Sequence, residues 1–258
     1  RFVKQMAAPL MTTTLAASFL LANPVTPVSM ARTTGGIVNV VSVGEPELLN
    51  PVFDRSPEAE SLYDLIYAGL IRQTAQGDLE ADLLNEVPTA ANGKVRMLPN
   101  GGMVVNYVLR NDLHWQDGQP ITTADIIYTW QVNTDPRVVS PATTGYENIQ
   151  RVEPISDREI NVYFYAPYGE YYQLFKYLLP RHSFRSAYWP FDRNHPYNRN
   201  PIGAGPFRLR EWKAGQSALL EANPYYHRAR AQLDQVRYQF KEKGFRSFKQ
   251  AADWANDA

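Results

Sequence analysis

The sequence predicts a domain of the α/β class (mixed α+β), and three patterns lead to that prediction. Residues 36–43 (GIVNVVSV) are a β-branched run, which is typical of a core strand. Residues 106–130 (NYVLRNDLHWQDGQPITTADIIYTW) indicate a strand, a tight turn and a capped helix, in that order. Further apolar segments of strand length lie on either side of turn residues.

Two helices are predicted from their start signals. Ser56 precedes Pro57, which places an N-cap residue before a proline at the first helical position. The apolar stripe of this helix is expected to contain Leu62, Tyr63, Leu65, Ile66 and Leu70. Thr122 and Asp125 have the spacing of a capping box and begin the second helix. A short aromatic-rich helix is also expected over residues 168–179.

The remaining strands are expected mainly as hairpins. Residues 71–102 contain three turn signals, at residues 76–77, 92–93 and 100–102. The later strands are expected at residues 149–152 with 159–165, at 206–212 with 217–222, and at 233–240.

Composition narrows the classes of function. The 26 Lys and Arg residues balance the 26 Asp and Glu residues, so no overall charge favours nucleic acid as a partner. A hydrophobic content of 44% with 20% charged residues is that of a globular protein. The sequence has no Cys, which excludes disulfides, thiolate metal sites and Cys nucleophiles within it.

The first residues resemble a targeting segment. Arg1 and Lys4 precede an apolar stretch, so residues 1–22 are interpreted as a signal peptide or an uncleaved membrane anchor. A buried N-terminal helix is the third interpretation. Residues 23–35, rich in Pro, Ser and Thr, are interpreted as a linker.

No motif in the sequence supports catalysis, a metal site or a cofactor. Residues 203–205 (GAG) fail as a dinucleotide fingerprint because Arg208 stands where a third Gly is needed. The histidines lack metal-ligand spacing and are interpreted as surface or turn residues: His114, His182, His195 and His227. The carboxylate pairs Glu45/Glu47 and Asp78/Glu80 are interpreted as solvated. No catalytic residue, metal ligand or cofactor is predicted, and we expect no enzyme.

Several segments, in the same order, resemble the peptide- and nickel-binding (family 5) solute-binding proteins of ABC importers. They are residues 49–51 (LNP), 67–70 (YAGL), 109–125 (LRNDLHWQDGQPITTAD), 179–182 (LPRH), 201–212 (PIGAGPFRLREW) and 223–226 (NPYY). The resemblance implies a type II periplasmic-binding-protein fold, in which a hinge closes two lobes over a ligand.

The same resemblance implies the domain organisation. Residues 36–241 would form the first lobe with a β-rich subdomain. Residues 242–258 would be a C-terminal tail, either the truncated start of the second lobe or a divergent helix. We therefore expect the second lobe to be largely missing.

Two loops of the family reach the ligand cleft: one follows the Leu-Asn-Pro segment, and the other follows the Trp-containing helix. Mapped by position, the candidate cleft residues are Asp54, Arg55 and Ser56 in the first loop, and Thr143, Thr144, Gly145 and Tyr146 in the second. Arg55 and Tyr146 are the preferred ligand neighbours. The alternative is that both loops are merely exposed.

The implied function is that of an extracytoplasmic solute-binding component of an ABC importer for oligopeptides, located in the periplasm or anchored through residues 1–22. Its partners would be a short peptide or another small solute and the importer's membrane subunits. The alternative is a truncated lobe that acts as a structural subunit of a membrane complex and binds no solute. A peptidase is the third hypothesis.

Overall fold

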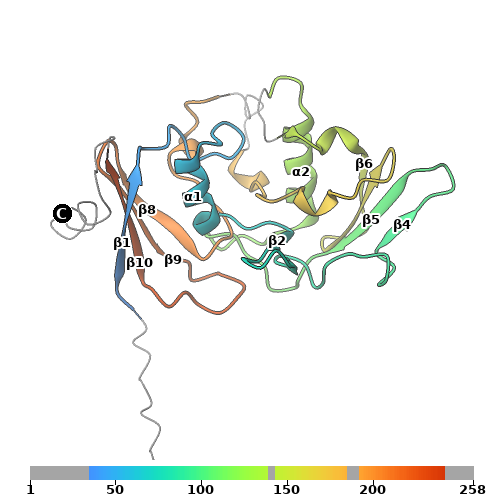
Figure 1. The fold of residues 1–258 in the computed structure, drawn as a ribbon, viewed down its shortest axis with the longest axis horizontal. Helices are drawn as coiled ribbons and strands as arrows, with labels where there is room; N and C mark the ends of the chain where they lie inside the picture. Colours follow the sequence, from blue (N-terminus) through green and yellow to red (C-terminus); the bar gives the residue numbers. More distant parts are fainter. Residues whose placement is uncertain (1–34, 139–142, 185–191, 242–258) are drawn as a thin grey trace, which may run out of the picture. The chain divides into compact units, whose positions relative to one another are not determined.

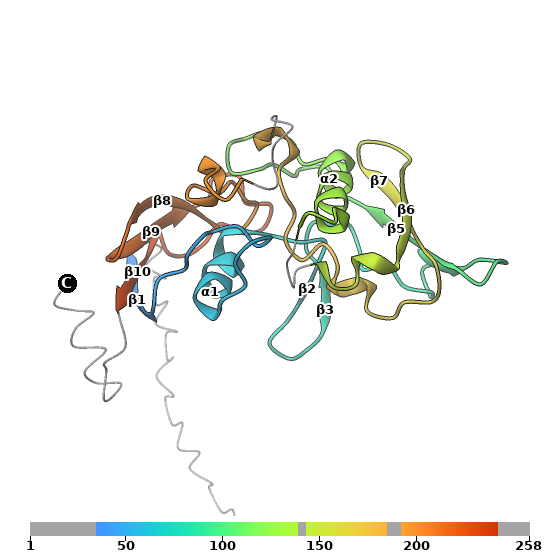
Figure 2. The ribbon, with the colours of Figure 1, turned by 90° about the horizontal axis from the view of Figure 1, so that it is seen from above.

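The computed structural model describes residues 35–138, 143–184 and 192–241. The predicted signal peptide or anchor (1–22), nearly all of the predicted linker (23–35) and the predicted tail (242–258) lie outside the described residues. Two four-stranded sheets, a two-stranded hairpin and two α-helices make up the described part (Figures 1 and 2).

The first sheet brings together the beginning and the end of the described chain. Its order is β1-β10-β9-β8, in which β1 runs parallel to β10 and the other neighbours are antiparallel. The strands are β1 (Ile37–Val43), β10 (Gln235–Lys241), β9 (Ser217–Ala222) and β8 (Phe207–Lys213). All four confirm predicted strands.

Helix α1 (Pro57–Ile66) covers this sheet. The Ser56 hydroxyl caps it by accepting a hydrogen bond from Ala59 N, as predicted. Leu62, Tyr63 and Ile66 are buried in one cluster with apolar side chains of β9 and β10. The helix ends at Ile66, so the prediction that Leu70 belongs to its stripe is wrong: Leu70 immediately precedes a strand.

The second sheet is antiparallel, with the order β4-β5-β7-β6. Its strands are β4 (Val95–Met97), β5 (Met103–Val108), β7 (Glu159–Phe164) and β6 (Ile149–Pro154). Helix α2 (Thr123–Thr134) lies beside this sheet and begins with the predicted capping box of Thr122 and Asp125 (Figure 1). The hairpin consists of β2 (Ile71–Gln73) and β3 (Leu79–Ala81).

The helix predicted over residues 168–179 is not formed. Within that segment there is only a single 3-10 turn, η3 (Tyr171–Gln173). Phe175 adopts a left-handed conformation with φ 57°, and its carbonyl oxygen accepts from Leu70 N at 3.1 Å. Leu178 N donates to Ala68 O at 3.3 Å. Backbone groups that a helix would pair internally are thus paired with another segment. Three more 3-10 turns are η2 (Tyr146–Asn148), η4 (Arg181–Ser183) and η5 (Pro196–Asn198).

Two polar residues that the sequence predicts to face solvent have protein partners instead. The His227 side chain is only 2% exposed and lies 2.9 Å from an Asp82 carboxylate oxygen, so it is not a surface histidine. Glu45 is not simply solvated, because its carboxylate accepts hydrogen bonds from Trp212 Nε1 and Gly215 N. Both contacts join residues far apart in sequence, which local patterns do not report.

Candidate functional site

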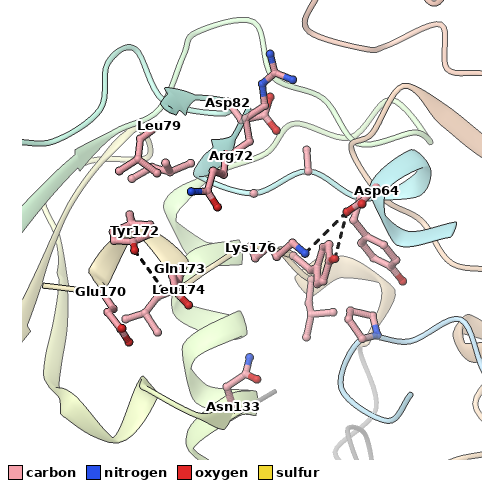
Figure 3. Close-up of a pocket in the computed structure, with 18 of the residues that line it drawn as sticks. Asp64, Arg72, Leu79, Asp82, Asn133, Glu170, Tyr172, Gln173, Leu174 and Lys176 are labelled. Carbon is pink, nitrogen blue, oxygen red and sulfur yellow. Dashed lines mark hydrogen bonds and ion pairs between the residues drawn. The ribbon is translucent and has the colours of Figure 1, made fainter. Parts of the chain in front are cut away.

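A cavity of about 870 Å³ lies where several segments distant in sequence meet (Figure 3). The loop before α1 and the turn after that helix form one wall, and hairpin β2–β3 forms another. The 143–146 loop and the irregular segment after β7 also line the cavity. The charged side chains that line the cavity are Arg55, Asp64, Arg72, Asp82, Glu170 and Lys176.

Of the first predicted cleft loop, residues 54–56, one residue lines the cavity and the other two hold the loop in place. Asp54 is buried, and its carboxylate accepts from the backbone N–H groups of Glu47, Leu48 and Ser56. Ser56 caps α1. Arg55 lines the cavity, with its guanidinium 2.5 Å from Glu60 and 5.3 Å from the centre of the Tyr177 ring. Asp54 and Ser56 therefore fix the loop from which Arg55 reaches the cavity.

In the second predicted cleft loop, residues 143–146, some residues also line the cavity while others shape the loop. Thr144 and Tyr146 line the cavity. Gly145 precedes η2 with φ 92°, and a Cβ atom there would lie 2.6 Å from the Tyr168 hydroxyl oxygen, so both conformation and space favour glycine. Thr143 is half-buried at the start of the loop. The structure thus brings Arg55, Thr144 and Tyr146 to one cavity.

Tyr146 also supports the cavity wall. Its side chain is buried, and its hydroxyl oxygen accepts from Phe175 N at 2.8 Å. This bond holds the left-handed turn at Phe175, whose neighbours Leu174 and Lys176 line the cavity. Burial raises the pKa of the Tyr146 hydroxyl, so the phenol stays neutral.

Sequence reasoning missed the lining residues that follow β7. The cavity is also lined from a segment that the sequence predicts as a short aromatic-rich helix, by Tyr168, Glu170, Tyr172, Lys176 and Tyr177. Its unusual content of tyrosine was the available signal, since aromatic residues with a polar end are common in ligand pockets.

Charged groups around Tyr177 are tightly connected. The Tyr177 hydroxyl donates to Glu60 at 2.7 Å, and Lys176 Nζ lies 3.5 Å from the same carboxylate. Burial and then the hydrogen bond to Glu60 raise the pKa of Tyr177. Arg55 and Asp64 complete this group, so its two cations and two carboxylates balance one another at this wall.

The sequence identifies the family of this chain. Residues 99–244, more than half of the chain, match the family model described as bacterial extracellular solute-binding proteins, family 5 Middle. The chain belongs to this family.

Curated relatives of this solute-binding protein agree with the family match. It is 26% identical over 208 residues to the oligopeptide-binding protein AppA of Bacillus subtilis, covering 79% of this chain and 37% of AppA. It is 26% identical over 153 residues to the periplasmic oligopeptide-binding protein OppA of Escherichia coli, covering 52% of this chain and 28% of OppA. The chain thus spans little more than a third of the length of AppA.

Solved structures confirm the type II periplasmic-binding-protein fold for the part present. AppA in complex with a nonapeptide superposes with a TM-score of 0.70 at 25% identity, covering 81% of this chain and 40% of that one. NikZ of Campylobacter jejuni, in complex with Ni(L-His), gives a TM-score of 0.70 at 21% identity and covers 87% of this chain and 42% of that one. The second comparison concerns the fold alone.

The described residues of the solute-binding protein offer neither a metal site nor a membrane-spanning helix. Among the described residues, no group of His, Cys, Asp and Glu could hold a metal ion. Across the same ranges, none of the helices is long and apolar enough to cross a membrane.

Proposed function

We propose that this chain carries a solute-contacting lobe of an extracytoplasmic receptor that binds short peptides and passes them to an ABC importer. One observation carries the proposal: two loops about ninety residues apart, around Arg55 and around Tyr146, line the same cavity. These are the loops that the family resemblance assigned to the ligand cleft. The seven predicted residues are therefore proposed as the cleft loops, with Arg55, Thr144 and Tyr146 toward the ligand.

The chemistry of the cavity suits a peptide. Its volume of about 870 Å³ lies within the range of small-ligand sites. Tyrosine rings supply apolar surface with a hydroxyl at the edge, and charged and amide side chains stand between them. A peptide likewise alternates polar backbone groups with side chains of varied character. The similarity to AppA, solved with a nonapeptide, supports the same class of ligand.

Receptors of this kind act by differential affinity. A ligand that contacts both lobes binds the closed state better than the open state and shifts the population toward closure. The two loops at this cavity would supply part of those contacts. The importer's membrane subunits would then recognise the closed state.

Thermal unfolding with peptides tests the proposal. The protein at its native length should rise in melting temperature with increasing concentrations of mixed short peptides, because a ligand that binds only the folded state stabilises it. A matched mixture of free amino acids is the control. An unchanged melting temperature over the whole peptide range, together with copurification of a membrane complex, would instead establish the structural-subunit alternative. Peptide cleavage by the pure protein would establish an enzyme.

A further inference from the structure

The charged side chains that line the cavity differ in whether another side chain neutralises them. All three cationic ones are in ion pairs: Arg55 with Glu60 at 2.5 Å, Lys176 with Glu60 at 3.5 Å, and Arg72 with Glu80. Two of the carboxylates are paired as well: Asp64 with Lys176 at 3.9 Å, and Asp82 with Arg228 at 3.0 Å. The cations of the cavity are therefore already occupied by protein carboxylates.

Glu170 is different. It is exposed, it lines the cavity, and within residues 35–138, 143–184 and 192–241 no ion pair joins it to a cation. Figure 3 shows Glu170 and Tyr172 on one side of the cavity and Asp64 on the other, with Lys176 between them. One end of the cavity thus carries a negative charge that no described side chain neutralises.

The negative charge of Glu170 affects the hydroxyl of Tyr168. Its pKa is raised, first by burial and then by the nearby charges of Glu170 and Glu147. Glu147, which follows the predicted cleft residue Tyr146, is also exposed. The Tyr168 hydroxyl in turn lies over Gly145, so this end of the cavity is continuous with the 143–146 loop.

We propose that the Glu170 end of the cavity binds a cationic group of the solute, an ammonium or a guanidinium, through the Glu170 carboxylate and the rings of Tyr168 and Tyr172. Carboxylates form short, charge-assisted hydrogen bonds with such groups. Aromatic rings attract cations through their negative faces. The proposal rests on the proposed function and narrows it to solutes that carry a positive charge.

Calorimetry with matched peptides tests the proposal on the protein at its native length. The ligands are three tripeptides that differ only in a central Lys, Met or Glu, and an N-acetylated form of the Lys and Met peptides. The Lys peptide should bind up to about fivefold more tightly than the Met peptide, the ratio expected for a partly exposed ion pair. The Glu peptide should bind most weakly.

Glu170→Gln identifies the carboxylate responsible. This exposed substitution should abolish the preference for Lys while the N-acetylated Met peptide, which carries no cation, keeps its affinity. Glu153→Gln is the matched control, because Glu153 is exposed on β6 and does not line the cavity. The control should keep the preference, which excludes a general effect of net charge.

The outcomes separate the two proposals. Equal affinity for all five peptides, acetylated or not, or a preference for Lys that survives Glu170→Gln, would overturn the cation site and leave the receptor function standing. Binding of no peptide would overturn the receptor function and the cation site with it. If acetylation of the Met peptide weakens binding in the wild type but not in Glu170→Gln, the bound cation is the peptide's terminal ammonium. If acetylation has no effect and only the central Lys strengthens binding, the bound cation is the Lys side-chain ammonium.

Discussion

Single residues can both line the cavity and support its wall, and Tyr146 is the clearest case. Its ring packs edge-on against Phe175 with ring centres 5.3 Å apart, and its hydroxyl accepts from the backbone N–H of the same residue. A left-handed phenylalanine is unfavourable on its own because its Cβ atom crowds the backbone. Tyr146 therefore holds in place a turn that the local sequence alone would avoid.

Tyr146→Phe should lower the free energy of unfolding by about 1–3 kcal/mol, because it leaves the Phe175 N–H buried without its acceptor. Urea unfolding followed by circular dichroism measures the change. Tyr165→Phe is the control, since the Tyr165 side chain is 64% exposed, and it should be nearly neutral. Equal stability of the two variants would show that the Tyr146 hydroxyl has no supporting role.

Residue-level prediction from sequence succeeded where the physics is local. Ser56 was predicted as an N-cap from its own neighbours, and it is one. The loop position of Arg55 could be inferred from family resemblance, but its packing against Tyr177 could not. That contact joins residues more than a hundred positions apart and depends on an irregular backbone between 168 and 179 that no short-range pattern reports.

Among the elements, α2 shows how a helix start can bind two segments together. Asp125 completes the capping box by accepting from Thr122 N at 2.9 Å, and its other oxygen accepts from Arg181 N at 2.9 Å. Desolvation of this buried carboxylate raises its pKa above the ordinary value of 3.8, although both hydrogen bonds lower it. The ionised form is thus less favourable in the folded state than in the unfolded chain.

This shift gives a pH dependence with a defined sign. A raised pKa means that the folded state binds the Asp125 proton more tightly, so its contribution to stability is full at low pH and falls as pH rises from 3.8 through the raised value. Asp125→Asn removes this titration. The difference in unfolding free energy, wild type minus variant, should therefore decrease over that range and then level off in urea unfolding from about pH 3 to about pH 7. A difference that increases with pH would contradict the account.

Elements with strong local signals were predicted well, and those without were not. The strands of both sheets and the two capped helices follow period-two alternation, turn residues and caps. The segment 168–179 has helix-compatible residues, yet its backbone pairs with residues 68–70. Tertiary hydrogen bonds outweighed weak propensity there, which is the expected failure of single-sequence reasoning.

For the described part as a whole, the central fact is that its core divides into two clusters. One lies under the β1-β10-β9-β8 sheet with α1, and the other under the β4-β5-β7-β6 sheet with α2. The buried amide of Gln116 joins them. Its Nε2 donates to Ile66 O at 2.9 Å and to Phe207 O at 2.7 Å, and its Oε1 accepts from Gly203 N at 2.9 Å. One side chain thus ties the end of α1, the start of β8 and the loop between the clusters.

Gln116→Met keeps the side-chain length but removes these three hydrogen bonds, so the variant should lose about 2–4 kcal/mol of unfolding free energy in urea. Hydrogen exchange should show faster opening at Gly203 and at Gly205, whose N–H still bonds to Ile66 O at 2.8 Å.

Gln119→Met, on the exposed part of the same turn, is the control and should change stability little. If both variants are equally stable, the amide does not couple the clusters. If only Gln116→Met destabilises the protein, and exchange rises in both sheets together, the two clusters unfold as one cooperative unit.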